Sequence, residues 1–174
     1  MKSNSNEFIP LGAPSFDQED IKEVIDSLES GWVGTGPKVS QFEKSFGNYV
    51  GVKSSLATNS CTAALHLSLM SLGLKPGDEV ITTPMTFCAT INTIIHAGAT
   101  PILADCNLND FCIDPERISE KITEKTRAIL PVHFAGMSCD METIMQLADD
   151  HSLFVIEDCA HSIETTFNGK HTGT

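Results

Sequence analysis

Two carboxylates and a histidine follow an apolar run near the end of the sequence. Residues 153–156 are apolar, and Glu157, Asp158 and His161 come soon after them. Such a run is typical of a buried strand in a parallel sheet, and ligands bind at the carboxyl ends of these strands. A carboxylate held there can form a charge-assisted hydrogen bond to a protonated ring nitrogen. We therefore predict that Asp158 lies at the floor of a ligand pocket. The alternative is a strand that simply continues into a polar loop, with His161 as a structural histidine.

A second group of candidate residues, Ser60, Cys61 and Thr62, lies between a predicted strand and a predicted helix. Small residues at a helix start leave backbone N–H groups free, and the helix dipole favours an anion there. The hydroxyl groups of Ser60 and Thr62 add donors, so the segment suits a phosphate group. Ordinary N-capping by Ser60 explains the same residues without a ligand. The glycine spacings of nucleoside triphosphatases and of dinucleotide-binding folds are absent.

Two further candidates, Phe87 and His133, also follow predicted strands. The ring of Phe87 can stack on a planar ligand, although a phenylalanine that begins an apolar helix is also typical of a core. His133 faces either the pocket or the end of the sheet, and we favour the pocket. Phosphate donors, a stacking ring and the Asp158 carboxylate together describe a site for pyridoxal 5′-phosphate (PLP). Asp158 would keep the pyridine nitrogen of PLP protonated, so that the ring can withdraw electrons.

The elements that must position these residues alternate between strands and helices. Helical periodicity predicts two helices, over residues 18–30 and 38–49, before the alternation begins. The predicted strands are 55–58, 79–83, 100–105, 128–132 and 153–157, and the predicted helices between them are 61–72, 87–97, 115–122 and 140–151. This alternation predicts a three-layer α/β/α fold with a mostly parallel sheet. The segment 167–174 predicts a tight turn.

Composition excludes several classes of partner. The sequence has 174 residues with 11 basic and 23 acidic side chains, a net charge of −12, which argues against binding to nucleic acid or an anionic membrane. No run approaches the roughly 18 apolar residues of a membrane span, and the polar N-terminus does not resemble a signal peptide. The six cysteines form no Cys-x-x-Cys pair, which predicts reduced thiols and no metal site. We therefore expect a cytoplasmic protein.

Several motifs occur together in one order along the chain. They are Gly31–Pro37 followed by Phe42-Glu43, Asn59–Leu65, Gly77–Pro84, Pro131–Gly136 and Glu157–His161. In this order the motifs resemble the DegT/StrS-type sugar aminotransferases, which belong to fold type I of the PLP-dependent enzymes, the aspartate-aminotransferase class. The resemblance implies that residues 51–174 are the N-terminal part of the PLP-binding large domain. It also implies that residues 1–50 are a helical segment whose glycine-rich loop lies on the substrate side.

The resemblance also implies roles for the candidate side chains. The cofactor-binding residues predicted in this way are Ser60, Cys61, Thr62, Phe87, Asp158 and His161. Asp158 would pair with the pyridine nitrogen, and His161, also predicted to be catalytic, would lie near the hydroxyl group of the ring. The predicted substrate-binding residues are Trp32, Thr35 and His133.

Members of the family typically transfer an amino group from glutamate to a nucleotide-linked keto-sugar, for surface polysaccharides or glycans, and they are usually homodimers. The amino-acid sequences of segments 31–37 and 131–136 are similar to those of enzymes that aminate C4 of a UDP-linked 4-keto-sugar.

One expected feature of the family is missing from residues 1–174. The Schiff-base lysine of the family lies in a serine- and phenylalanine-rich segment after Gly-x-x-Gly-Thr, and the sequence contains no such segment. We therefore expect this chain to be a fragment without transaminase activity of its own. A PLP-dependent sugar dehydratase with histidine in place of the lysine is one alternative. A non-catalytic module that binds a phosphorylated ligand or a partner chain is another.

Overall fold

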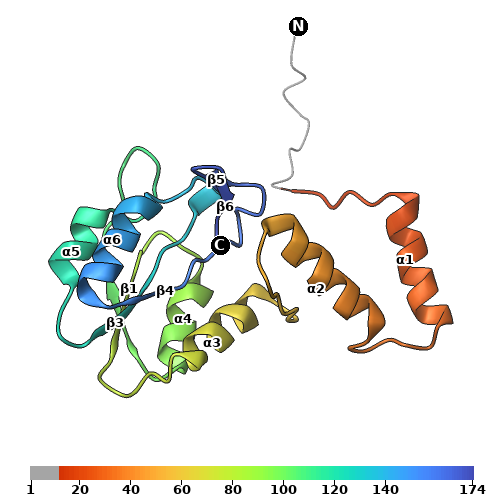
Figure 1. The fold of residues 1–174 in the computed structure, drawn as a ribbon, viewed down its shortest axis with the longest axis horizontal. Coiled ribbons are helices and arrows are strands. Elements are labelled where there is room, and N and C mark those ends of the chain that lie inside the picture. Colours follow the sequence, from red (N-terminus) through yellow and green to blue (C-terminus); the bar gives the residue numbers. More distant parts are fainter. Residues whose placement is uncertain (1–11) are drawn as a thin grey trace, which may run out of the picture. The chain divides into compact units, whose positions relative to one another are not determined.

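The structure of the protein is a computed structural model that describes residues 12–174 (Figure 1). The chain divides into two compact units, one that ends at Phe42 and one that comprises Glu43–Thr174. The first unit is helical, whereas the second contains the sheet and the helices that cover it. The candidate residues from Ser60 to His161 all belong to the second unit.

The first unit contains helix α1 (Gln18–Glu29) and the start of α2 (Pro37–Val50). Asp17 begins α1 with a capping box, in which its side chain accepts from the Asp20 N–H and the Asp20 side chain accepts from the Asp17 N–H. Pro37 occupies the first turn of α2, where a missing N–H costs nothing. Both helices agree with the ranges predicted from the apolar periodicity.

The second unit is built on a parallel sheet of four strands. They are β1 (Glu79–Thr82), β2 (Thr100–Leu103), β3 (Thr126–Leu130) and β4 (Phe154–Val155). Their order is β2-β1-β3-β4, so β1 and β3 are central and have neighbours on both sides. Four of the five predicted strands are therefore confirmed, with ends that differ by a few residues.

Helices cover both faces of this sheet (Figure 1). They are α3 (Cys61–Ser71), α4 (Cys88–His96), α5 (Pro115–Lys121) and α6 (Met141–His151), together with a 3₁₀ turn η1 (Phe134–Gly136). The pair α3 and α4 packs on one face, and the pair α5 and α6 packs on the other. The predicted α/β/α layers are thus observed.

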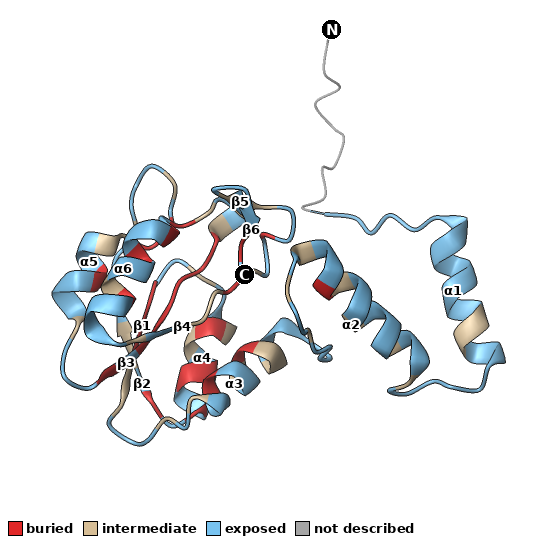
Figure 2. Cartoon of the chain, viewed as in Figure 1, coloured by how far each residue is buried: buried red, intermediate tan, exposed pale blue. Residues whose placement is uncertain are grey.

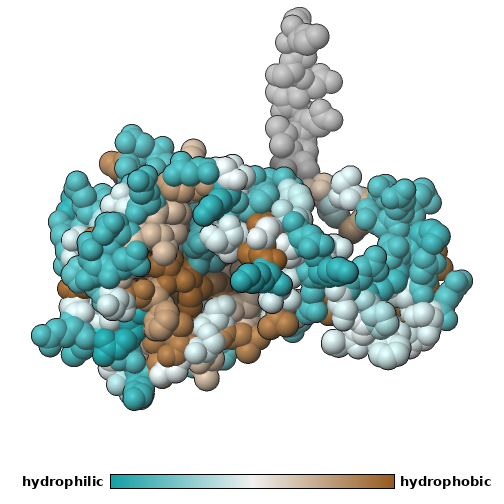
Figure 3. Space-filling view, in the orientation of Figure 1, coloured by the Kyte–Doolittle hydropathy of each residue, from teal (hydrophilic) through white to brown (hydrophobic). Residues whose placement is uncertain are grey.

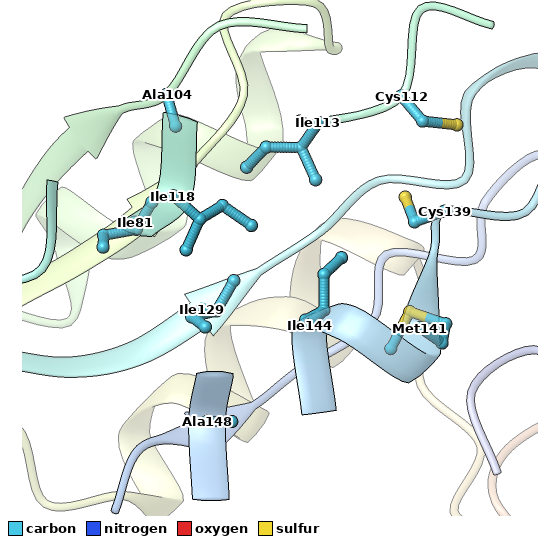
Figure 4. Close-up of a cluster of buried hydrophobic side chains, with 10 residues drawn as sticks. All are labelled: Ile81, Ala104, Cys112, Ile113, Ile118, Ile129, Cys139, Met141, Ile144 and Ala148. Carbon is cyan, nitrogen blue, oxygen red and sulfur yellow. The ribbon is translucent and has the colours of Figure 1, made fainter. Parts of the chain in front are cut away.

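Alternate residues of the central strands face the two helical layers. Val80 and Leu130 lie in the apolar cluster with the side chains of α3 and α4. Ile81 and Ile129 lie in the other cluster, with α5 and α6 (Figure 4). Side chains alternate in this way because successive residues of a strand point to opposite faces. Figure 2 shows the result in the central strands β1 and β3, which are buried along most of their length.

The strand connections create a switch point between β1 and β3. The chain leaves β1 through α4 to reach β2 on one side, and then passes through α5 to β3 on the other side of β1. These two crossovers have the same hand but run in opposite directions along the sheet. Their helices therefore lie on opposite faces of the sheet, as observed for α4 and α5. The loops after β1 and β3 therefore diverge, and ligands bind in crevices of this kind.

The predicted strand at residues 55–58 is wrong, because this segment contains no regular structure. Its polar groups bond to α2 in place of a neighbouring strand. The Ala57 N–H donates to Glu43 Oε1 over 2.9 Å, and the Ser55 hydroxyl donates to the Glu43 carbonyl oxygen. The segment therefore serves as a connection between α2 and α3.

The predicted turn near the end of the sequence is a two-residue hairpin. It joins β5 (Thr166–Phe167) to β6 (Lys170–His171) in an antiparallel pair. Asn168 and Gly169 occupy the turn with φ angles of 49° and 79°. Two successive positive φ angles are typical of a type I′ turn, which Asn-Gly favours.

Strand β4 lies at one edge of the sheet. Its residue Phe154 is exposed over 56% of its surface, and apolar residues gather on the molecular surface in this region (Figure 3).

None of the helices within residues 12–174 combines the length and the apolar character that a membrane span requires.

Candidate active site

Asp158 occupies the position expected for it, just beyond β4 at the carboxyl edge of the sheet. Its backbone bridges to Val132, with its N–H donating to the Pro131 oxygen over 2.9 Å and its oxygen accepting from the His133 N–H over 3.2 Å. Because these bonds continue the pairing of β3 with β4, the backbone of Asp158 is held by the sheet. The residue is only 5% exposed.

Polar groups from three other residues contact the Asp158 carboxylate. Thr90 donates its hydroxyl to Oδ2 over 2.8 Å, and the Ala160 N–H donates to Oδ1 over 3.2 Å. The Cys61 thiol lies 3.8 Å from Oδ1. Behind Thr90, the hydroxyl of Thr86 is 2.7 Å from the Thr90 hydroxyl. The N-terminal ends of α3 and α4 therefore meet at this carboxylate.

The Asp158 carboxylate has no cationic partner within residues 12–174, since none of the ion pairs in this part of the chain includes it. A buried carboxylate without a cation is costly. Each of its oxygens can accept more than one hydrogen bond, so capacity remains after Thr90 and Ala160 have donated. A protonated ring nitrogen would supply both the charge and a donor.

The same carboxylate acts on the thiol of Cys61. Partial burial of the thiol, and then the negative charge of Asp158, raise the pKa of Cys61 above its usual range. Both effects disfavour the thiolate. Cys61 therefore acts as a neutral donor beside Asp158 and is not an activated nucleophile.

The start of α3 provides backbone donors next to Asp158. Ser60 is the N-cap, and its Oγ accepts from the Ala63 N–H over 3.2 Å. The N–H groups of Cys61 and Thr62 have no acceptor within the helix, because the first helical bond runs from the Ala64 N–H to the Ser60 oxygen. Both residues are exposed. Ser60 thus does cap the helix, and the donors that remain can accommodate an anion.

Phe87 immediately precedes α4 and leaves its ring 74% exposed. It adjoins Thr86, which is hydrogen bonded to Thr90, the partner of Asp158. Phe87 is therefore not a core residue, and its exposed ring is available to a planar ligand.

His133 lies on the other face of the sheet from the Asp158 side chain. Val132 belongs to the cluster of α3 and α4, so its neighbour His133 points the opposite way. The ring is fully buried, with Nε2 2.8 Å from Glu157 Oε2 and Nδ1 accepting from the Cys139 N–H over 3.1 Å. The structure does not bring His133 together with Asp158.

The environment of His133 favours its protonated form. Burial lowers the pKa, but hydrogen bonds with Cys159 and Glu157 outweigh it and raise the pKa of His133 to about 9. The Cys139 N–H acts against this, because it requires a lone pair on Nδ1. In the neutral ring the proton therefore lies on Nε2, between the ring and Glu157.

His133, Glu157 and Cys159 are the one group in residues 12–174 whose metal-ligating atoms lie close together, all within 4.8 Å. A metal bound at Nε2 would leave the ring without a proton, since Nδ1 accepts from Cys139. Metal-bound imidazoles normally keep a proton on the second nitrogen and donate it. This geometry is therefore unsuited to a metal ion.

We expect the raised pKa of His133 to reduce stability at alkaline pH. A folded-state pKa above the unfolded value adds stability that is fully present below about pH 6.5. This stability is lost as the pH rises through about 9. The full shift corresponds to about 3 kcal/mol, but the opposing Cys139 N–H leads us to expect about 1 kcal/mol. Urea denaturation over this range measures the loss.

Two variants serve as controls for this pH dependence. His133→Gln removes the titrating group, so its alkaline loss of stability should be smaller than that of the wild type. Glu157→Gln keeps the ring and removes one of its partners, so it should give an intermediate loss. An equal loss in all three proteins would contradict the assignment to His133.

His161 is exposed and lies over the turn that follows β3. Its Nδ1 accepts from the Ala135 N–H over 3.4 Å, and its ring contacts Phe134 edge-on with centroids 6.2 Å apart. The predicted substrate residues Trp32 and Thr35 belong to the first unit. There the Trp32 Nε1–H donates to the Thr35 oxygen over 2.8 Å.

The sequence analysis missed two residues of the site, Thr86 and Thr90. Thr90 is fully buried inside a helix, where a hydroxyl needs an acceptor and is otherwise unfavourable. A buried threonine near the start of an apolar helix was therefore the signal available in the sequence. Which acceptor it finds depends on the register of β4 against β3.

The fold is shared with solved aminotransferases. The Streptococcus pneumoniae protein Spr1654 in its PMP form matches with a TM-score of 0.92 and 35% identity, over 95% of this chain and 46% of that one. Its PLP form matches with a TM-score of 0.90. The chain belongs to the DegT/DnrJ/EryC1/StrS aminotransferase family, whose model matches residues 14–174. The cofactor of this family is PLP.

Two curated relatives show the same relationship in sequence. The spore coat polysaccharide biosynthesis protein SpsC of Bacillus subtilis is 51% identical over 174 residues, which are 100% of this chain and 45% of that protein. The UDP-4-amino-4-deoxy-L-arabinose–oxoglutarate aminotransferase of Shewanella sediminis is 42% identical over 97% of this chain and 44% of its own length. The chain thus spans less than half the length of these relatives.

Proposed function

We propose that this chain is the N-terminal part of an enzyme that transfers an amino group, from glutamate, to a nucleotide-linked keto-sugar. The observation that carries the proposal is the Asp158 carboxylate, which is 5% exposed, lacks a cationic partner in residues 12–174 and adjoins the N-terminus of α3. A pyridine nitrogen and a phosphate group on one ligand satisfy these two features together.

Each candidate residue near Asp158 has a part in this proposal. Asp158 would hold the ring nitrogen in its protonated form, and Thr90 would orient the carboxylate through its 2.8 Å hydrogen bond. Ser60, Cys61 and Thr62 would bind the phosphate at the start of α3, and Phe87 would stack on the ring. His161 would donate a hydrogen bond near the ring hydroxyl. When bound, the cofactor supplies an electron-withdrawing ring.

The names of the relatives support a sugar as the amino acceptor. One acts in spore coat polysaccharide biosynthesis, and another is named for a UDP-linked 4-amino sugar. We propose a UDP-linked 4-keto-sugar as the substrate. Trp32 and Thr35, in the segment 1–50, are proposed as substrate-binding residues. We propose no contact between His133 and the substrate, because its ring is buried and bonded to Glu157. We further propose a cytoplasmic homodimer for the full-length enzyme.

We propose that the covalent step requires a lysine that residues 51–174 do not supply. Residues 51–174 would be the N-terminal part of the PLP-binding domain, and no lysine in them has the serine- and phenylalanine-rich context of the family. We therefore propose that residues 1–174 bind the cofactor noncovalently and do not turn over substrate by themselves.

Binding of pyridoxamine 5′-phosphate tests this proposal, because its amine forms no Schiff base with surface lysines. We expect the protein to bind this compound more tightly than pyridoxamine by at least about tenfold, since the phosphate contributes charge-assisted hydrogen bonds at α3. Inorganic phosphate should compete. Fluorescence titration of the bound ring measures both.

Two outcomes would count against the proposal. Equal affinity for pyridoxamine and its phosphate would remove the role of the α3 N-terminus. Binding that inorganic phosphate cannot displace would place the compound elsewhere. A Ser152→Ala variant, on an exposed loop after α6, serves as a control for nonspecific effects and should bind like the wild type.

A further inference from the structure

The turn Phe134–Gly136 holds a strained residue next to the candidate site. Ala135 has a φ angle of 51°, in the left-handed region that residues other than glycine rarely adopt. The next residue, Gly136, has a φ angle of 85°. Strain of this kind persists only where the surroundings impose it.

Contacts with the loop after β4 impose this conformation. Thr165 donates its hydroxyl to the Gly136 oxygen over 2.7 Å. A Cβ atom at Gly136 would lie 3.4 Å from the His161 oxygen, so the turn packs closely against the backbone of His161. Within the turn, the Met137 N–H donates to the Phe134 oxygen over 2.9 Å.

The strained turn directs two groups at the imidazole ring of His161. The Ala135 N–H donates to Nδ1 over 3.4 Å. The Phe134 ring contacts the imidazole at an interplanar angle of 65°, and Phe111 contacts Phe134 with centroids 6.3 Å apart. A nitrogen that accepts from an N–H must carry a lone pair, so in the neutral ring the proton lies on Nε2.

We propose that the turn Phe134–Gly136 is a positioning element that fixes His161 as the tautomer with its proton on Nε2. His161 then acts on a bound ligand as a hydrogen-bond donor through Nε2, and it does not accept a proton there. The identity of the ligand as PLP rests on the proposed function, whereas the tautomer does not. Ala135 and Phe134 act through His161 and have no contact of their own with the ligand in this proposal.

The tautomer can be measured on the protein without any ligand. Two-bond ¹H–¹⁵N correlation spectra, recorded where the ring is neutral, distinguish a nitrogen that bears a proton from one that bears a lone pair. We expect the Nδ1 of His161 to show a lone pair and Nε2 to show the proton. A proton on Nδ1, or equal populations of the two tautomers, would overturn the proposal.

Two variants separate positioning by the turn from the intrinsic preference of imidazole. Thr165→Val removes the hydroxyl that holds Gly136, and Phe134→Ala removes the ring that packs on His161. In each, we expect the population of the Nδ1-protonated tautomer to rise about 2- to 10-fold, the range for loss of one hydrogen bond. Unchanged populations in both variants would show that the turn does not set the tautomer.

The same spectra provide controls. Thr100→Val changes an exposed threonine on the edge strand β2 and should leave His161 unaltered. His133, whose Nδ1 accepts from the Cys139 N–H, should keep its proton on Nε2 when neutral, in all variants that retain the fold. Because no ligand is present, failure of pyridoxamine 5′-phosphate to bind would leave this result intact, and the two proposals fail separately.

Discussion

Replacing Asp158 with alanine is expected to lower the affinity for pyridoxamine 5′-phosphate by about 10- to 100-fold. Hydrogen bonds to charged groups contribute about 1.5–3 kcal/mol, and each 1.4 kcal/mol corresponds to about a factor of ten in affinity. The carboxylate is buried, so water replaces it poorly as a partner for the pyridine nitrogen. Titration of wild type and variant under the same conditions measures the ratio.

A cofactor analogue with carbon in place of the pyridine nitrogen isolates this interaction. The analogue should bind the wild type and Asp158→Ala with similar affinity, because it has no nitrogen for the carboxylate to hold. Asp149→Ala, at an exposed position on α6, is the matched control and should bind like the wild type. If Asp158→Ala loses as much affinity for the carbon analogue as for the natural compound, the carboxylate does not pair with the nitrogen.

Ile129→Ala is expected to lower the free energy of unfolding by about 2–5 kcal/mol. Ile129 is fully buried on central strand β3 and pairs in register with Ile81 and Val155 on the strands beside it. It packs in the cluster that α5 and α6 cover (Figure 4). Truncation would leave a cavity between the sheet and these helices, which cannot close without moving both. Chemical denaturation measures the change.

The matched control is Ile95→Ala on α4, where the isoleucine is 54% exposed. This variant should change the free energy of unfolding by less than about 1 kcal/mol, because little apolar surface leaves the protein interior and alanine favours a helix. A loss at Ile129 no larger than that at Ile95 would mean that the sheet does not form the core described here.

Much of the fold follows from the sequence because the apolar periods differ between its elements. The buried run at residues 79–83 and the helical spacing at 87–97 each specify one kind of element, and both are observed as β1 and α4. The alternation of strands and helices predicts a strand at residues 55–58, which the structure does not contain. The polar groups of this segment bond to Glu43, a long-range partner that a local pattern cannot reveal.

The sequence predicts where Asp158 and Ser60 lie in the fold, but it does not predict which way the side chains around them point. Asp158 and Ser60 could be found because each follows or precedes an element at a recognisable boundary. The side of the sheet that a residue faces depends on the pairing of β3 with the end of β4, which places His133 and Asp158 on opposite faces. The hydroxyl of Thr90 reaches Asp158 only through that same pairing.

The contacts of Asp158 also have a consequence for the order of folding. Its partners Cys61 and Thr90 lie 97 and 68 positions away along the chain, and each parallel strand pair must be joined through a crossover helix. Contacts with such long sequence separation form slowly, because large loops must close first. The contacts of the Asp158 carboxylate are therefore expected to form only when β3 and β4 have paired. A molecule that binds there would recognise the completed sheet alone, and it would stabilise the folded state of the whole second unit by mass action.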